Sequence, residues 1–288
     1  MAEVVYLGVD GGGTGCRARV ENESGEVLGQ GLAGPATTRL GIDEAWASVM
    51  SAVGAALGEA GVDMATSTVH AGIGIAGLGR IGALEALQQR GRCFASVAFV
   101  NDGLAACLGA HSGADGAIVI AGTGSIGIGH VGARELRVGG YGFPISDEGS
   151  GADLGLQAMR LALRAFDGRI ERTSLLAEVM HRFRDDPMQA VAWMDKATAT
   201  DYATFAPMVM RHADQGDPAA RRIVQSAAEQ LDALVRALFD QGAPRVALLG
   251  GLSSAIEPWL SPDIRRRLKP ADGDAVSGAL ILARRGVV

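Results

Sequence analysis

Short apolar runs alternate along the chain with longer stretches in which apolar residues recur at helical spacing. Three short runs at 3–9, 16–20 and 27–31 open the chain and predict strands joined by turns. Further short runs predict strands at 70–76, 96–100, 117–121, 126–131, 134–138 and 246–251. Helical spacing predicts helices at 43–60, 84–90, 151–166, 174–184, 219–241 and 274–285. A strand meander followed by alternating helices and strands is typical of an α/β fold.

One arrangement occurs twice in this pattern. A strand, a glycine-rich turn and a second strand run through 4–20, and the same succession returns at 117–131 with similar elements behind it. Two copies of such a meander with helices predict two lobes that face one cleft. Clefts are where α/β proteins bind small ligands.

Composition and charge narrow the classes of function. Glycine is frequent, at 42 of 288 residues, which indicates tight turns and close backbone approaches. The net charge of −6, without a basic stripe, argues against a nucleic-acid partner. A membrane-spanning helix needs about 18 consecutive apolar residues, and no run in the sequence approaches that length, so we expect no membrane span. The opening MAEVVYLGVD lacks the basic start of a signal peptide, so we expect a cytoplasmic protein.

The chain has three cysteines, Cys16, Cys93 and Cys107. They are far apart and form no CxxC motif, so they predict neither a disulfide framework nor a zinc site. Their position in a strand or among apolar neighbours favours buried structural thiols over ligands of an iron–sulfur cluster.

Two glycine-rich turns carry the strongest chemical signal. DGGGT at 10–14 and GTGS at 122–125 leave the backbone N–H groups open and add the hydroxyls of Thr14, Thr123 and Ser125. Such turns cradle phosphates, and one in each lobe could hold a polyphosphate from two sides. Asp10 would then anchor Mg²⁺, because a bare carboxylate beside phosphates would repel them.

A transfer of phosphate to a hydroxyl also needs a base. Asp102 follows the predicted strand 96–100, at the end where α/β folds present catalytic groups. The alternative is that Asp102 only caps a helix over 103–110. The two phosphate turns favour the catalytic interpretation.

A third glycine motif, GLGRIG at 77–82, supports a different class of function. It follows a predicted strand, precedes a helix and has Asp102 further on, as a dinucleotide fold would require. An NAD-dependent oxidoreductase therefore stays as an alternative, although the chain opens with another motif. A non-catalytic nucleotide-binding protein is a further alternative, since it would keep the turns without needing Asp102.

The motifs together resemble a known superfamily, that of sugar kinases, actin and heat-shock chaperones. DGGGT, ND at 101–102, AGTGS, PISDEGSG at 144–151 and LLGG at 248–251 occur here in order, and the resemblance extends to DAVSGALILA at 274–283. More narrowly the chain resembles the N-acetylglucosamine kinase and bacterial glucosamine kinase branch of the BadF/BadG ATPase family. The resemblance implies two ribonuclease-H-like, actin-type ATPase lobes around a cleft. We place them at 1–104 plus 275–288 and at 105–274, hinged near 102–116.

The resemblance also implies roles for individual residues. Asp102 would be the base for a sugar 6-hydroxyl, and Asp147 would bind sugar hydroxyls unless it or Glu148 caps a helix beginning near Ser150. Thr37 stands where relatives often carry an asparagine that contacts the sugar, and Tyr141 or Phe143 could line the sugar edge. The glycine-rich residues are assigned by ligand: Gly11, Gly12, Gly13, Thr14, Gly122, Thr123, Gly124 and Ser125 to the phosphates of ATP, Gly250 and Gly251 to the adenosine, and Gly124 also to the sugar.

The sequence therefore predicts an ATP- and Mg²⁺-dependent kinase that phosphorylates the 6-hydroxyl of glucosamine or N-acetylglucosamine. An activator ATPase of the BadF type is the first alternative. The expected partners are the amino sugar and ATP, with no nucleic acid and no membrane. A homodimer is compatible with the sequence, which leaves the oligomeric state open.

Overall fold

The structure, a computed structural model, describes residues 3–286. Contacts divide the described chain into a first unit (3–116, 132–134 and 270–286) and a second unit (117–131 and 135–269). The predicted boundaries at 104/105 and 274/275 differ from these. Helix α3 (Asp102–Ala110) lies wholly in the first unit because it packs closely on α12 (Ala275–Arg285). A Cβ on Gly109 would come within 1.8 Å of the Asp274 carbonyl, so this crossing depends on a glycine.

The first unit is built on a five-stranded sheet in the order β3-β2-β1-β4-β5. Its strands are β1 (Val4–Gly11), β2 (Cys16–Glu21), β3 (Val27–Ala33), β4 (Thr68–Ile75) and β5 (Ser96–Asn101). The first three form an antiparallel meander, and β4 and β5 run parallel to β1. Alternation in β1 buries Val5, Leu7 and Val9 completely. The predicted strands and the α/β class are confirmed.

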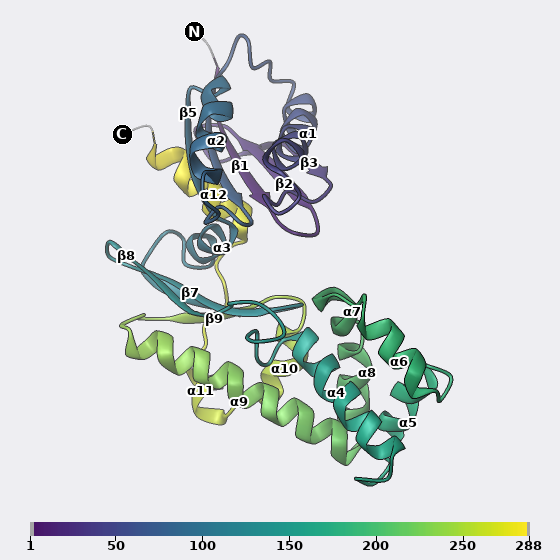
Figure 1. Cartoon of the computed structure of the whole chain (residues 1–288). Coiled ribbons are helices and arrows are strands. Elements are labelled where there is room, and N and C mark those ends of the chain that lie inside the picture. Colours follow the sequence, from purple (N-terminus) through teal and green to yellow (C-terminus); the bar gives the residue numbers. More distant parts are fainter. Residues whose placement is uncertain (1–2, 287–288) are drawn as a thin grey trace. The chain divides into compact units, whose positions relative to one another are not determined.

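Helices cover both faces of this sheet. Helix α1 (Ile42–Ala60) packs on β3 and β2, and the C-terminal α12 packs on β1 and β4 beside α3. Strand β1 and helix α12 thus lie side by side although they are far apart in the sequence, as the yellow helix among the purple and blue elements of Figure 1 shows. The short α2 (Ala83–Arg90) and η1 (Gly91–Cys93) lead from β4 to β5. The predicted return of the last helix to the first lobe is therefore correct.

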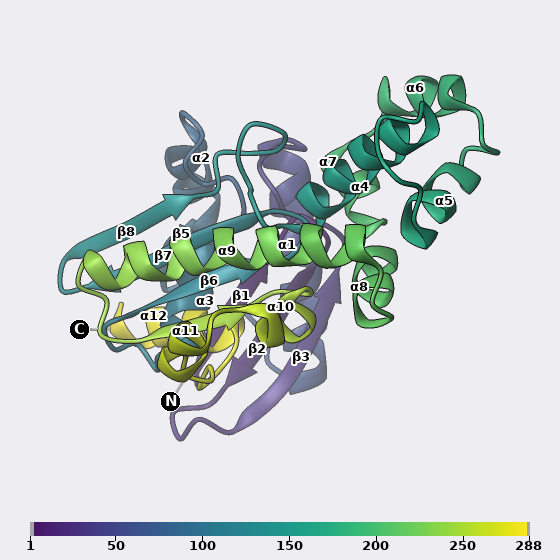
Figure 2. The same ribbon diagram turned by 90° about the horizontal axis from the view of Figure 1, so that it is seen from below.

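The second unit has a four-stranded sheet in the order β8-β7-β6-β9. Its strands are β6 (Gly116–Ala121), β7 (Ser125–Val131), β8 (Arg134–Gly139) and β9 (Val246–Leu249). Strand β9 runs parallel to β6. The long helix α9 (Pro218–Asp240) lies along this sheet in Figure 2, with its Leu238 against Gly127 of β7.

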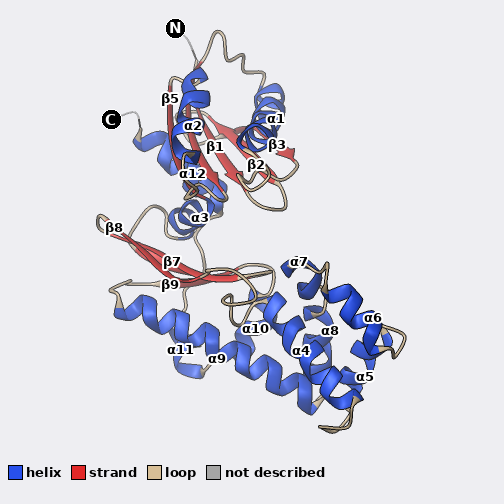
Figure 3. Cartoon of the chain, viewed as in Figure 1, coloured by secondary structure: helices blue, strands red, loops and turns tan. Residues whose placement is uncertain are grey.

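Between β8 and α9, the second unit forms a bundle of helices, labelled α4 to α8 in Figure 3. Its helices are α4 (Gly151–Phe166), α5 (Ser174–His181), α6 (Pro187–Met194), α7 (Ala199–Ala203) and α8 (Ala206–Asp214). The predicted helix over 174–184 is too long, and α6, α7 and α8 were not predicted. After β9 the chain continues through α10 (Ser253–Ile256), η2 (Glu257–Trp259) and α11 (Pro262–Arg267). Among residues 3–286, no helix has the length and apolarity to cross a bilayer.

Candidate active site

The first glycine-rich turn joins β1 to β2 as an open hairpin. The Gly12 N–H donates to the Gly15 carbonyl at 2.9 Å, and the Gly12 carbonyl accepts from Ala36 N–H at 3.0 Å. A Cβ on Gly13 would meet no atom within 4 Å, and Gly13 and Thr14 are exposed. The hairpin is therefore held at its base while its tip leaves N–H groups and a hydroxyl open to a ligand, which fits a phosphate.

Two carboxylates lie at the same edge of this sheet. Asp10 pairs in register with Gly74 of β4, and Gly74 pairs with Val100 of β5. Asp102 follows β5 directly as the first residue of α3. The carboxyl ends of parallel strands meet at one edge, so Asp10 and Asp102 flank Gly74. The absence of a side chain at Gly74 is what lets α3 cross at this point, since a Cβ there would lie 2.6 Å from the Ala105 Cβ.

Asp102 is not the cap of α3. Asn101 is the N-cap, and its side-chain oxygen accepts from Gly103 N–H at 3.0 Å. Burial raises the pKa of Asp102, and the negative charge of Asp10 adds to that effect. Nearby backbone N–H groups oppose both, but the net shift is upward. An upward shift brings the pKa of Asp102 closer to the working range of a proton acceptor, and its role as a base stays a prediction.

Asp10 has an ion-pair partner that the sequence analysis did not identify. The Arg17 guanidinium donates to Asp10 Oδ2 from Nη2 at 2.6 Å and from Nε at 3.3 Å. Among residues 3–286, no cluster of three or more His, Cys, Asp or Glu side chains could hold a metal alone. Mg²⁺ commonly uses one or two carboxylates and completes its shell with water and substrate phosphates. A single Asp10 beside a phosphate hairpin fits that pattern.

Thr37 lies at the same edge but is largely buried, with 7% of its surface exposed. It forms a parallel bridge with Ala76, which directly follows β4, and its hydroxyl accepts weakly from Arg39 N–H at 3.4 Å. The predicted contact between Thr37 and the sugar stays a prediction.

The second glycine-rich turn joins β6 to β7 in the second unit. Gly122 N–H donates to the Gly124 carbonyl at 2.9 Å. The first N–H groups of α4, from Gly151 and Ala152, donate to the carbonyls of Gly122 and Thr123 at 2.8 and 3.1 Å. The helix start thereby fixes one side of the turn, and Thr123 at its tip is exposed. The predicted phosphate contact of Ser125 is not supported by its side chain, because Ser125 is buried and its hydroxyl donates to the Glu148 carbonyl at 2.7 Å.

Asp147 lies over this second turn. Its Oδ2 would be 2.6 Å from a Cβ on Gly124, and its Oδ1 accepts from Gly142 N–H at 3.1 Å. The backbone of Asp147 is left-handed, with φ of 67°. Ser150 is the N-cap of α4 and accepts from Asp153 N–H, so neither Asp147 nor Glu148 has the capping role considered as an alternative. The structure therefore brings Asp147 and Gly124 together, and their predicted contact with the sugar stays a prediction.

Gly250 and Gly251 follow β9 at the same edge as the second turn. Gly250 has φ of 101°, and a Cβ there would lie 2.3 Å from the Ala121 carbonyl at the end of β6. A Cβ on Gly251 would meet nothing within 4 Å. Gly250 is thus required by the packing of β9 on β6, while Gly251 leaves open space that a ligand could use.

Comparison with known proteins decides the family. Residues 7–283 match the model of the BadF/BadG/BcrA/BcrD ATPase family. The chain belongs to that family. It is 40% identical over 279 residues to the glucosamine kinase GspK of Vibrio cholerae, covering 96% of this chain and 95% of the relative. It is 29% identical over 301 residues to an N-acetylmuramic acid/N-acetylglucosamine kinase of Clostridium acetobutylicum, covering 96% and 97%.

Solved structures show the same fold. A Chromobacterium violaceum protein described as a candidate N-acetylglucosamine kinase is 35% identical with a TM-score of 0.88, covering 98% of this chain and 99% of that chain. A glucokinase of the ROK family from Streptomyces griseus is 22% identical with a TM-score of 0.55, covering 98% and 100%. The second likeness concerns the fold alone.

The GLGRIG motif has a packing role in this family member. Gly77 has φ of 80°, and a Cβ there would lie 2.4 Å from the Thr38 hydroxyl, which donates to the Gly77 carbonyl at 2.7 Å. The turn that begins at Thr37 therefore fills the space that a pyrophosphate would need at the first glycine. This geometry and the ATPase family argue against the NAD-dependent alternative.

The prediction of three buried cysteines is correct for two of them. Cys16 and Cys107 are buried as predicted, but Cys93 is exposed, because it ends the surface turn η1. Burial raises the pKa of Cys16 to about 12, and the negative charge of Asp10 adds to this shift.

The two aromatic candidates for the sugar edge differ in their surroundings. Tyr141 is 70% exposed beneath the Arg137 guanidinium. The Phe143 ring packs on Tyr202 at 5.0 Å, so core packing accounts for Phe143.

Proposed function

We propose that the chain is an ATP-dependent kinase that transfers the γ-phosphoryl group of ATP to the 6-hydroxyl of an amino sugar, glucosamine or N-acetylglucosamine. Membership of the ATPase family and the 40% identity to a glucosamine kinase support this assignment. The observation that carries it is the placement of Asp102 beside Asp10 at the edge that also bears the open hairpin. Binding alone would need the hairpin but no second carboxylate with a raised pKa.

The two hairpins would bind the nucleotide. The hairpin tips at Gly13–Thr14 and Thr123–Gly124, with the hydroxyls of Thr14 and Thr123, suit phosphate oxygens, whereas the buried Ser125 hydroxyl already donates to the Glu148 carbonyl at 2.7 Å. Gly251 offers the open surface beside which adenosine would lie. Asp10 would hold Mg²⁺, which when bound offsets the charge of the phosphates. Its Oδ1 accepts no hydrogen bond in the described part of the chain, so one oxygen stays available.

Asp102 would act on the acceptor. Its carboxylate takes the proton of the sugar 6-hydroxyl as that oxygen bonds to the γ-phosphorus and the bond to ADP breaks. Exclusion of water around the half-buried Asp102 once the sugar is bound would favour the sugar over water as acceptor. Asp147 would hold two sugar hydroxyls as donors to its carboxylate, with Gly124 and Thr37 at the sugar as well. We expect the reaction to take place in the cytoplasm.

The test is ADP release from ATP and Mg²⁺ with glucosamine, N-acetylglucosamine, glucose or no sugar. Stimulation by one amino sugar well above the other arms would support the kinase and identify its substrate. Equal ADP release in all arms would contradict it and favour an activator ATPase of the same family. No release in any arm, with ADP still bound, would favour a non-catalytic nucleotide-binding protein.

A further inference from the structure

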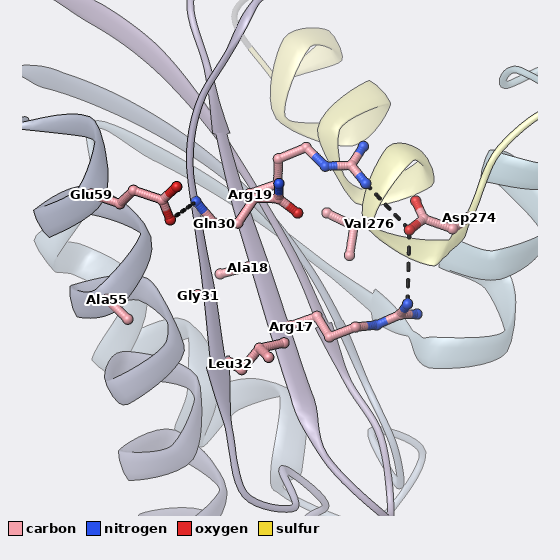
Figure 4. A pocket seen from close by; sticks show the side chains of 10 residues that line it. All are labelled: Arg17, Ala18, Arg19, Gln30, Gly31, Leu32, Ala55, Glu59, Asp274 and Val276. Carbon is pink, nitrogen blue, oxygen red and sulfur yellow. Dashed lines mark hydrogen bonds and ion pairs between the residues drawn. The ribbon is translucent and has the colours of Figure 1, made fainter.

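A ladder of charges crosses β1, β2 and the start of α12. Asp10 and Arg17 are directly opposite each other in the antiparallel register of β1 and β2. Arg17 Nη1 also lies 3.9 Å from Asp274 Oδ2, and that oxygen accepts from Arg19 Nη2 at 3.3 Å. Figure 4 shows both arginines reaching from β2 toward Asp274. Arg17 is therefore shared between the carboxylate of the candidate metal site and a carboxylate outside it.

Asp274 is a fixed point in this ladder. It is the N-cap of α12, where its Oδ1 accepts from Ser277 N–H at 2.9 Å and from the Ser277 hydroxyl at 2.8 Å. Arg19 Nη1 donates to the same hydroxyl at 3.3 Å. Because α12 packs tightly on β1 and α3, its start cannot move far. Asp274 thus stabilises the position of the Arg17 guanidinium through Nη1, while Nη2 and Nε bind Asp10.

Both bonds from Arg17 to Asp10 end on the same oxygen. Nη2 and Nε approach Oδ2, and Oδ1 accepts no hydrogen bond from the described residues. This geometry fixes the carboxylate torsion without occupying the second oxygen. Removal of a group that orients a metal-binding carboxylate commonly lowers metal affinity or activity about 10- to 100-fold.

The pair makes little contribution to the fold. Arg17 lines a surface groove of about 490 Å³ together with Arg19, Gln30, Leu32, Glu59 and Asp274, and its side chain is 51% exposed. The Asp10 side chain is 17% exposed, but solvent at Arg17 screens the pair, so we expect it to add only about 1 kcal/mol to stability. The pair also lies directly beside the phosphate hairpin, because Asp10 and Arg17 flank the turn in the register of β1 and β2.

We propose that Arg17 is a positioning residue for the metal site, which holds Asp10 so that Oδ1 faces the Mg²⁺ of the bound nucleotide. The proposal rests on the proposed function, because it needs a metal–nucleotide complex at Asp10. In this role Arg17 acts through Asp10, which it contacts, and not on the sugar or the reacting atoms. Its effect is on the metal-dependent part of nucleotide binding.

The experiment compares Arg17→Met with Arg19→Met, the same substitution on the next arginine of the same strand face. ADP affinity is measured by calorimetry in Mg²⁺ and again in EDTA, and Mn²⁺ binding to the protein–ADP complex by electron paramagnetic resonance. We expect Arg17→Met to weaken ADP binding about 10-fold in Mg²⁺ and to weaken Mn²⁺ binding likewise, with ADP affinity in EDTA changed less than about twofold. Arg19→Met should change none of these. Arg17→Lys, which keeps one charged donor, should fall between the wild type and Arg17→Met.

Several outcomes would overturn the proposal. Equal losses in Mg²⁺ and EDTA would mean that Arg17 binds phosphate directly. Unchanged affinity in both, or tighter Mn²⁺ binding, would mean that the pair is only structural or competes with the metal. Failure of the proposed function is separate, since it would show in the wild type as absence of sugar phosphorylation, whatever Arg17 does to Mn²⁺ and ADP.

Discussion

Asp102 lies over Gly74. The Cα of Asp102 is 3.5 Å from the point that a Cβ on Gly74 would occupy, and the Ala105 Cβ is only 2.6 Å from that point. Gly74 in turn pairs with Asp10 in the register of β1 and β4. One glycine in the middle strand of the three parallel strands therefore sets how closely α3 can bring its first carboxylate to the edge that bears Asp10.

Replacement of Gly74 should affect both the stability of the fold and the position of Asp102, and the two effects can be measured separately. Gly74→Val would push α3 outward, since the 2.6 Å approach leaves no room for a Cβ. We expect a loss of about 1 to 3 kcal/mol in the free energy of unfolding. We also expect kcat to fall about 10- to 100-fold, because a shift of about 1 Å in a catalytic group has effects of that size. Denaturant unfolding and steady-state kinetics measure the two effects. Gly54→Ala on the exposed face of α1, where a Cβ meets nothing within 4 Å, is the control. Normal kcat in Gly74→Val would argue against a catalytic role for Asp102.

Asp102→Asn should remove turnover and leave nucleotide binding intact. The amide cannot accept the proton of the sugar hydroxyl, so we expect kcat to fall by roughly two to four decades. ADP affinity should change little, since the hairpin and Asp10 remain. Turnover kinetics and calorimetry with ADP check both parts. A variant that keeps near-normal turnover would show that another group is the base.

The raised pKa of Asp102 makes two pH-dependent predictions. Burial raises the pKa, so the acid limb of kcat/KM should have its midpoint above the ordinary value of an aspartate. The folded state holds the proton more tightly than the unfolded chain, so the stability contributed by Asp102 falls as pH rises through the raised pKa. Asp102→Asn should therefore raise Tm at pH 7 while abolishing turnover. A lower Tm at pH 7 would mean that the ionised carboxylate stabilises the start of α3 more than its burial disfavours it.

Gly250 and Gly251 form a matched pair for the adenosine site. Gly250→Ala places a Cβ 2.3 Å from the Ala121 carbonyl at a φ of 101°, so it should lower Tm by several degrees. Gly251→Ala meets no atom, so Tm should stay within about 1 °C of the wild type while ADP affinity falls, if adenosine abuts this position. Thermal unfolding and calorimetry separate the two effects. Unchanged ADP affinity in Gly251→Ala would remove Gly251 from the nucleotide site.

Asp147 should act on the sugar and not on the nucleotide. Asp147→Ala removes the carboxylate that lies over Gly124, and loss of charge-assisted hydrogen bonds to two hydroxyls should raise the sugar KM about 10- to 100-fold. The KM for ATP should stay within about twofold. Glu148→Gln is the control, because Glu148 is its exposed neighbour. A rise in the KM for ATP as large as that for sugar would contradict the assignment.

The local sequence pattern could predict those site residues that lie at the ends of strands. Short apolar runs located β1, β2 and β5, and the polar residues that follow β1 and β5 gave Asp10 and Asp102. The pairing of Asp10 with Arg17 depends on the register across the Gly12–Gly15 hairpin, and a glycine-rich loop does not fix its own register. Arg17 appeared in the sequence only as a polar residue of an alternating strand.

The helices α6, α7 and α8 were not predicted because their stability comes from one another. They are short, and their starts depend on local caps such as Asp186, which accepts from Met188 N–H, and Thr198 with Asp201. Their apolar contacts are aromatic and join different segments of the bundle: the Trp193 ring lies 5.5 Å from the Phe183 ring and 4.8 Å from the Tyr202 ring. Helices of this length are set by tertiary packing rather than by sequence period.

Asp217 joins two of the bundle helices to α9. It caps α9 by accepting from Ala219 and Ala220 N–H, and its other oxygen accepts from Leu175 N–H at 2.9 Å and the Ser174 hydroxyl at 2.8 Å. Ser174 lies 3.1 Å from His212 Nδ1 on α8, which extends the network to that helix. Burial alone would raise the pKa of Asp217, but these hydrogen bonds outweigh it and lower the pKa to about 2.

Asp217→Asn should therefore destabilise the second unit in a pH-dependent way. A carboxyl whose pKa is lower in the folded state stabilises the fold above its unfolded pKa and loses that contribution as pH falls through the folded value. We expect a loss of about 2 kcal/mol in the free energy of unfolding at pH 7, which should shrink by about half at pH 3. Urea unfolding of both proteins at the two pH values measures it. Asp214→Asn, at the exposed end of α8, should show no such difference. If the loss caused by Asp217→Asn is equal at pH 7 and pH 3, the negative charge of Asp217 does not contribute to stability. The loss would then come from the changed hydrogen-bond geometry of the side chain.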